Sequence, residues 1–140
     1  MAERSDSDVL QVWQHVLADL DESDLAEASE EAYGEVLDEP GIAFAERLVR
    51  AWNDNEDTVN ETLLSSLEGW TFSQMNQTDL NILRLAVTEL LYEPGVPFEV
   101  TIEMAVRQAK KFGGEESGRF VNGVLGRVVR SEGFEARRAA

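Results

Sequence analysis

The side chains best suited to binding chemistry are basic and lie towards the end of this 140-residue chain. Six of them fall on the last two predicted helices, namely Arg107, Lys110, Lys111, Arg119, Arg127 and Arg130. Residues 1–100, by contrast, hold 23 of the 28 acidic residues and only 4 of the 12 basic ones. This asymmetry indicates that the C-terminal part can meet an anion while the rest repels one. The alternative is that the basic residues only balance the negative ends of helices.

The net charge of −16 also has a simpler explanation, which is a solvated acidic surface. Such a surface suits a salty cytoplasm, where self-repulsion is screened within about 3 Å at 1 M salt. The acidic segment at residues 19–39 does not have calcium-loop spacing, because the glycine at the sixth loop position and the closing glutamate are missing. We therefore expect solvated carboxylates there and no metal site.

The sequence contains no catalytic constellation. His15 is the only histidine and there is no cysteine, so a serine or threonine nucleophile would lack a partner base. Gly113-Gly114 has neither the dinucleotide-binding nor the Walker spacing. We therefore predict a binding protein that is not an enzyme and that needs no cofactor. A cytoplasmic location is expected, because neither an apolar run of about 18 residues nor a signal-peptide pattern is present.

Helical periodicity predicts the elements that position the basic residues. Seven helices and no strand are expected, which makes the chain all-α. In chain order, their apolar faces fall within residues 9–20, 25–36, 45–52, 59–67 and 80–91, followed by two helices over residues 98–112 and 115–130. The helix around 80–91 is apolar nearly all round, which predicts a central and buried position.

Local signals predict how these helices begin, end and pack. Thr78 is expected to cap the central helix, and Gly113 or Gly114 can take the left-handed conformation that ends a helix. Trp70 and Phe72 follow a glycine in a short connection. They are expected to plug the junction between two helical layers, and stacking on a ligand is the alternative.

Two overlapping stretches carry a resemblance to a known family. Residues 110–125 read KKFGGEESGRFVNGVL, and residues 78–113 read TDLNILRLAVTELLYEPGVPFEVTIEMAVRQAKKFG, with the isolated Trp70 ahead of them. They closely resemble the NusB family of transcription antitermination factors. The resemblance implies an all-helical fold of two small packed bundles. It also implies a single NusB-like domain over residues 1–140, and we expect frayed tails at 1–7 and 134–140.

The resemblance further implies a function. The chain would pair with NusE, a small-subunit ribosomal protein, and the pair would bind single-stranded boxA RNA of nascent rRNA within the RNA polymerase antitermination complex. Arginine supplies a fork for phosphate, and asparagine can read a base edge. The residues implied in RNA binding are Arg4, Gln11, Glu116, Ser117, Arg119, Phe120, Asn122 and Gly123. Those implied in partner binding are Asp79 and Arg84, since an acidic platform suits a basic ribosomal protein.

The chain departs from the family pattern at two places. Residues 3–11 read ERSDSDVLQ where the family has an arginine-rich stretch, and the carboxylates of Asp6 and Asp8 repel phosphate. Glu103-Met104 stands where the family commonly has Asn-Glu. The alternative function is therefore a NusB-fold interaction module that has lost RNA binding. A further alternative, the RNA-binding domain of an rRNA cytosine methyltransferase, is disfavoured because 140 residues leave no room for the catalytic domain.

Overall fold

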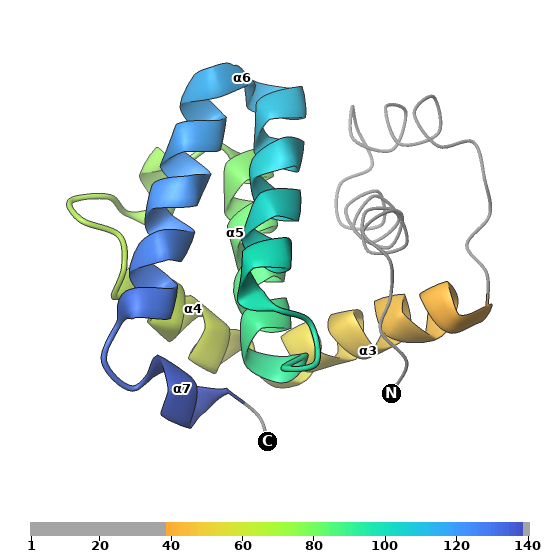
Figure 1. The fold of residues 1–140 in the computed structure, drawn as a ribbon. Coiled ribbons are helices and arrows are strands. Elements are labelled where there is room, and N and C mark those ends of the chain that lie inside the picture. Colours follow the sequence, from red (N-terminus) through yellow and green to blue (C-terminus); the bar gives the residue numbers. More distant parts are fainter. Residues whose placement is uncertain (1–38, 139–140) are drawn as a thin grey trace.

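The computed structural model describes residues 39–138, and all of the regular elements in this range are helical. They are α3 (Glu39–Asp54), α4 (Glu56–Leu64), the 3₁₀ helix η1 (Phe72–Gln74), α5 (Gln77–Tyr92), α6 (Phe98–Arg130) and α7 (Phe134–Arg137) (Figure 1). The all-α prediction is thus confirmed for this part of the chain. The two helices predicted nearest the N-terminus lie outside the described residues.

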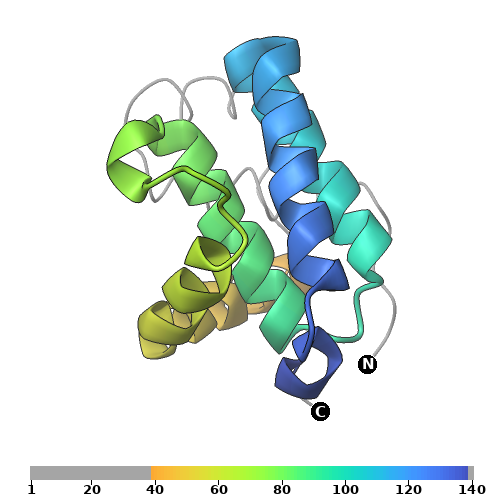
Figure 2. The ribbon, with the colours of Figure 1, turned by 90° about the vertical axis from the view of Figure 1, so that its left-hand side faces the viewer.

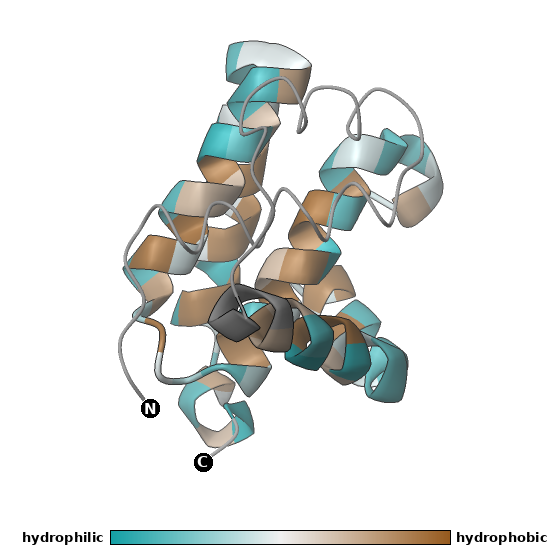
Figure 3. Ribbon diagram, turned by 90° about the vertical axis from the view of Figure 1, so that its right-hand side faces the viewer, coloured by the Kyte–Doolittle hydropathy of each residue, from teal (hydrophilic) through white to brown (hydrophobic). Residues whose placement is uncertain are grey.

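Helix α5 is the centre of the packing, as its sequence predicts. It contacts α3, α4 and α6, and its side chains Ile82, Leu83 and Leu90 have no exposed surface. Apolar residues concentrate where the helices meet (Figure 3). Polar contacts also bind α5 to its neighbours, since Thr101 on α6 donates a hydrogen bond to the buried carboxylate of Glu89. The cap at the start of α5 differs from the prediction, because Asn76 and not Thr78 caps the helix.

Helix α6 is a hairpin of two arms joined at the predicted two-glycine break. Gly114 has φ 80° and ψ −171°, and the chain reverses there between a first arm (residues 98–113) and a second arm (residues 115–130). The two arms lie side by side against α5 (Figures 1 and 2). The prediction that one of the two glycines takes a positive φ is confirmed at Gly114.

Replacing Gly114 with alanine is expected to lower the free energy of unfolding by about 2 kcal/mol, because its backbone conformation is nearly restricted to glycine. A Cβ at this position would meet no atom within 4 Å, so the whole effect is backbone strain. Urea denaturation measures it. Gly95→Ala is the matched control, since a Cβ there also meets open space and Gly95 does not have a positive φ. Equal stability of the two variants would contradict the assignment of strain to Gly114.

The C-terminal residues correct one expectation. A frayed tail was expected over residues 134–140, but Phe134–Arg137 forms helix α7 and the Phe134 side chain is only 1% exposed. Gly133, at φ 85°, turns the chain back towards the bundle. Arg138 Nε then donates a hydrogen bond of 2.9 Å to the carbonyl oxygen of Leu90 near the end of α5. The buried ring of Phe134 and the hydrogen bond from Arg138 to α5 therefore attach to the core a segment whose sequence is typical of a polar tail.

No helix in residues 39–138 combines the length and the apolar character needed to cross a membrane. Within the same residues, no three His, Cys, Asp or Glu side chains lie close enough together to hold a metal ion.

Candidate nucleic-acid interface

The second arm of α6 carries six of the residues predicted to contact RNA, and its helical geometry divides them between two faces. Phe120 and Asn122 are two positions apart, which places them about 200° from each other around the helix. Glu116, Ser117 and Phe120 line one hollow of the surface, whereas Asn122 lines another. Arg119 is exposed. The structure therefore does not gather the predicted residues into one patch.

The first hollow lies between the second arm of α6 and the start of α5, and we call it the Trp70 hollow. Its volume is about 330 Å³. It is lined by Trp70, Gln74, Met75, Asn76, Asp79, Glu116, Ser117 and Phe120. The rings of Trp70 and Phe120 lie 5.3 Å apart between centroids and are tilted by 59°. Two aromatic rings at the edge of a hollow can stack a flat ligand.

Trp70 corrects the prediction that it plugs a junction between helical layers. Trp70 is 47% exposed, and Leu64 is the only other large hydrophobic residue that is exposed among the described residues. Phe72, on η1, is partly buried against the core and contacts a guanidinium, as described below. The local sequence does not distinguish the two aromatic residues, and only the path of the chain before the start of α5 exposes one and partly buries the other.

Asp79 ties the start of α5 to the second arm of α6. Its side chain is 7% exposed, and its Oδ2 accepts hydrogen bonds from Ser117 Oγ at 3.1 Å and from Asn76 Nδ2 at 3.2 Å. Its backbone N–H donates in turn to Asn76 Oδ1 at 2.8 Å. The other carboxylate oxygen, Oδ1, is buried without a hydrogen-bond partner among the described residues. Since Asp79 is buried, it offers a partner protein little surface of its own.

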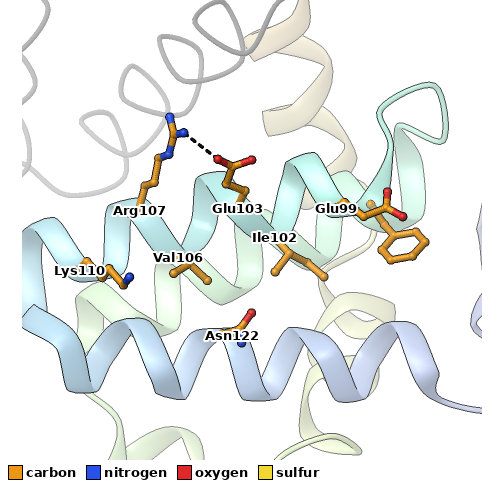
Figure 4. A pocket seen from close by; sticks show the side chains of 8 residues that line it. Glu99, Ile102, Glu103, Val106, Arg107, Lys110 and Asn122 are labelled. Atoms are coloured by element: carbon orange, nitrogen blue, oxygen red, sulfur yellow. Dashed lines mark hydrogen bonds and ion pairs between the residues drawn. The ribbon is translucent and has the colours of Figure 1, made fainter.

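The second hollow is a groove between the two arms of α6, and Figure 4 shows it from close by. Its volume is about 500 Å³, and it is lined by Phe98, Glu99, Ile102, Glu103, Val106, Arg107, Lys110 and Asn122. Asn122 points from the second arm towards the first (Figure 4). Arg107 Nη2 donates to Glu103 Oε1 at 2.7 Å on the groove's exposed rim.

The departure from the family pattern at Glu103-Met104 has a structural explanation. Glu103 is exposed and forms the surface ion pair with Arg107, one turn further along the helix. Met104 has no exposed surface and belongs to the core. The pair therefore divides between the solvent and the core, as adjacent residues on an amphipathic helix do.

Arg84, the other residue predicted to bind a partner, is engaged within the chain. Its guanidinium lies over the rings of Trp52 at 5.5 Å and Phe72 at 5.1 Å, and its Nε donates to Asn60 Oδ1 at 3.1 Å. Burial lowers the pKa of Arg84, and the negative charge of Glu56 opposes that shift. Arginine stays protonated at neutral pH even so, and the stacked cation binds α5 to α3, α4 and η1.

The basic residues of the C-terminal part have different roles. Arg119 is exposed and makes no hydrogen bond or ion pair with the described residues. Arg127 Nε donates to the carbonyl oxygen of Ser66 at 2.8 Å, which fixes the loop after α4 to the second arm. Arg137 donates to Thr62 Oγ1 at 3.2 Å. The charge asymmetry of the sequence is therefore real, but part of it serves internal hydrogen bonds.

Two residues beside the predicted site, Trp70 and Arg127, are not among those implied in RNA binding, although the sequence offers stacking on a ligand as an alternative for Trp70 and counts Arg127 among the basic residues. Trp70 lies across from Phe120, and Arg127 lies on the same side of the second arm, almost two turns beyond Phe120. The period of the helix could have placed Arg127 on the same face as Phe120. The predicted RNA contacts Arg4 and Gln11 lie outside the described residues.

Comparisons with known proteins agree with this architecture. The sequence model of the NusB family matches residues 7–130. A transcription antitermination protein NusB from Thermus thermophilus is 48% identical over 120 residues, which cover 86% of this chain and 75% of that protein. Another, from Deinococcus deserti, is 50% identical over 97 residues, which cover 68% of this chain and 56% of that protein.

Solved structures show the same fold. NusB of T. maritima superimposes with a TM-score of 0.71 at 33% sequence identity, and the match covers 94% of both chains. A chain from a structure of the antitermination factors NusB and NusE in complex with double-stranded RNA matches with a TM-score of 0.64 at 21% identity, over 94% of this chain and 95% of that one. At that identity, the second match supports the fold alone.

Proposed function

Because the chain belongs to the NusB family of transcription antitermination factors, we propose that it pairs with the ribosomal protein NusE and that the pair binds boxA RNA of nascent rRNA. The pair would act within the RNA polymerase antitermination complex, in the cytoplasm. A protein with the same fold was solved together with NusE and double-stranded RNA, and these belong to the two proposed classes of partner. The proposed RNA-binding surface is the second arm of α6. The observation that supports this choice is that the arm presents aromatic and basic side chains at the surface.

The predicted RNA contacts take distinct roles in this proposal. Arg119 is exposed and has no partner among residues 39–138, so its guanidinium is available to a phosphate. Glu116 and Phe120 meet bases in the Trp70 hollow, and Asn122 meets the RNA at the groove between the arms. Gly123 leaves the backbone of the second arm open to close approach. Ser117 is 8% exposed and bonded to Asp79, so it positions the arm.

The contact with NusE remains a proposal at Asp79 and Arg84. Both side chains make internal contacts, so they would shape the surface that NusE meets more than they would touch it. The acidic balance of residues 1–100 favours a basic ribosomal protein through the rate and specificity of association.

A second function is favoured by one observation in the sequence. Asp6 and Asp8 replace the arginine-rich stretch of the family, and carboxylates repel phosphate. The chain would then be an interaction module that binds NusE and has lost RNA binding.

Fluorescence anisotropy of labelled boxA RNA, measured with and without NusE at two salt concentrations, tests both functions. Binding is expected to tighten when NusE is present. Because this chain supplies few phosphate contacts, the affinity is expected to fall only weakly as the salt concentration rises. A scrambled RNA of equal length is the control. NusE binding without any RNA binding would favour the interaction module, and equal binding of both RNAs would contradict boxA recognition.

A further inference from the structure

The Trp70 hollow contains a large apolar surface that the fold leaves open. Trp70 is 47% exposed, although its ring packs at 5.3 Å from the partly buried Phe120. Exposed tryptophan next to a second aromatic ring and a hollow of about 330 Å³ is typical of a ligand site.

The loop that carries Trp70 is held on both sides. Before it, Arg127 donates to the carbonyl oxygen of Ser66 at 2.8 Å, and Gly69 turns the chain at φ 75°. After it, the N–H of Thr71 donates to Gln74 Oε1 at 2.9 Å, which closes a capping box at the start of η1. The position of Trp70 is therefore organised before any ligand arrives, which reduces the entropy lost on binding.

The charges around the hollow indicate which part of a nucleotide would enter it. The carboxylates of Glu116 and Asp79 line it, and they repel a phosphate. Arg119 follows Glu116 on the second arm, and Arg127 lies about 10 Å beyond Phe120 along the helix axis. This arrangement suits a base in the hollow and phosphates on the arginines outside it.

We propose that Trp70 and Phe120 form a stacking platform for one unpaired base of the RNA, and that this base is a guanine. The inference rests on the proposed function and adds a residue and a base preference to it. The Glu116 carboxylate is exposed and makes no hydrogen bond to the described residues, so its two oxygens can accept the adjacent N1–H and N2–H of guanine. Uracil offers one N–H donor and no amino group.

The test measures boxA RNA affinity of the complex with NusE for the wild-type chain and three variants. Trp70→Ala is expected to weaken RNA binding by about 5- to 150-fold, because a stacked base is lost. Trp70→Phe retains a ring and is expected to keep most of the affinity. Leu64→Ala is the matched control, since Leu64 is also 47% exposed but lies outside the hollow, and it is expected to bind as the wild type does.

A direct readout uses fluorescence. In a variant with Trp13→Phe and Trp52→Phe, Trp70 is the remaining tryptophan, and bound boxA RNA is expected to quench its emission. Inosine, which lacks the N2 amino group, is then placed at each guanine of the RNA in turn. At one of these positions, the replacement of guanine by inosine is expected to weaken RNA binding at least about 5-fold. If no position does so, the assignment to guanine is overturned.

The possible outcomes distinguish a failure of this inference from a failure of the proposed function, which is boxA RNA binding together with NusE. If the wild-type complex binds boxA but Trp70→Ala binds equally well and the emission of Trp70 does not change, the platform is refuted and the function stands. If no variant binds RNA, including the wild type, the proposed function itself fails. If Trp70→Ala loses binding to NusE and not to RNA, the Trp70 hollow contacts the protein partner and the inference is overturned.

Discussion

Replacing Phe134 with alanine is expected to lower the free energy of unfolding by about 3–5 kcal/mol, the usual cost of removing a buried phenylalanine ring. The ring is 1% exposed and is part of the hydrophobic core, and the guanidinium of Arg138 lies over it with 5.5 Å between Cζ and the ring centroid. Urea denaturation followed by circular dichroism measures the change. The variant tests whether α7 is an integral part of the fold.

The control for Phe134→Ala is Glu135→Ala, in the next residue of the same short helix. Glu135 is exposed, so its removal is expected to change the stability by no more than about 0.5 kcal/mol. Phe134→Leu preserves part of the buried volume and is expected to fall between the two. A change in Phe134→Ala as small as that of the control would mean that residues 134–138 form a frayed tail after all.

Asp79→Ala is expected to have the second largest effect, a loss of about 3 kcal/mol. Hydrogen bonds to a charged group contribute about 1.5–3 kcal/mol each, and the variant leaves the buried hydroxyl of Ser117 without its acceptor. Asp79 also places a negative charge in the first turn of α5, where the helix dipole favours it. Thermal or urea denaturation measures the loss.

Two further variants separate the contributions of Asp79. Asp79→Asn keeps an acceptor for Ser117 but removes the charge, so it is expected to be less destabilising than Asp79→Ala. Asp57→Ala removes an acid from the first turn of α4, where the exposed side chain has no such network, and a change below about 1 kcal/mol is expected. If Asp57→Ala costs as much as Asp79→Ala, the link between α5 and the second arm contributes nothing measurable.

The same variants address the predicted role of Asp79 at a partner surface. If Asp79 positions the second arm through Ser117, Asp79→Ala is expected to weaken RNA binding at a temperature where the variant is still folded. If Asp79 contacts NusE directly, Asp79→Asn is expected to reduce NusE affinity while its stability stays close to that of the wild type. Isothermal titration with NusE distinguishes the two roles.

Local sequence patterns correctly predict the main helices from α3 to α6 and the chain reversal within α6. The nearly continuous apolar pattern around Leu83 and Leu90 predicts a central helix, and α5 is central because a helix that is apolar all round has no stable place at the surface. The break at Gly113-Gly114 is likewise local, since it depends on the backbone freedom of one residue.

Which of the predicted residues are exposed, and which contact one another, depends on how the helices pack. The sequence does not distinguish Trp70 from Phe72, or a polar tail from the anchored α7, because exposure depends on the neighbours that distant segments supply. Asp79 and Ser117 are 38 positions apart, and their contact exists only once α6 folds back on α5. Local periodicity specifies the faces of a helix, but the packing of the whole chain decides what each face touches.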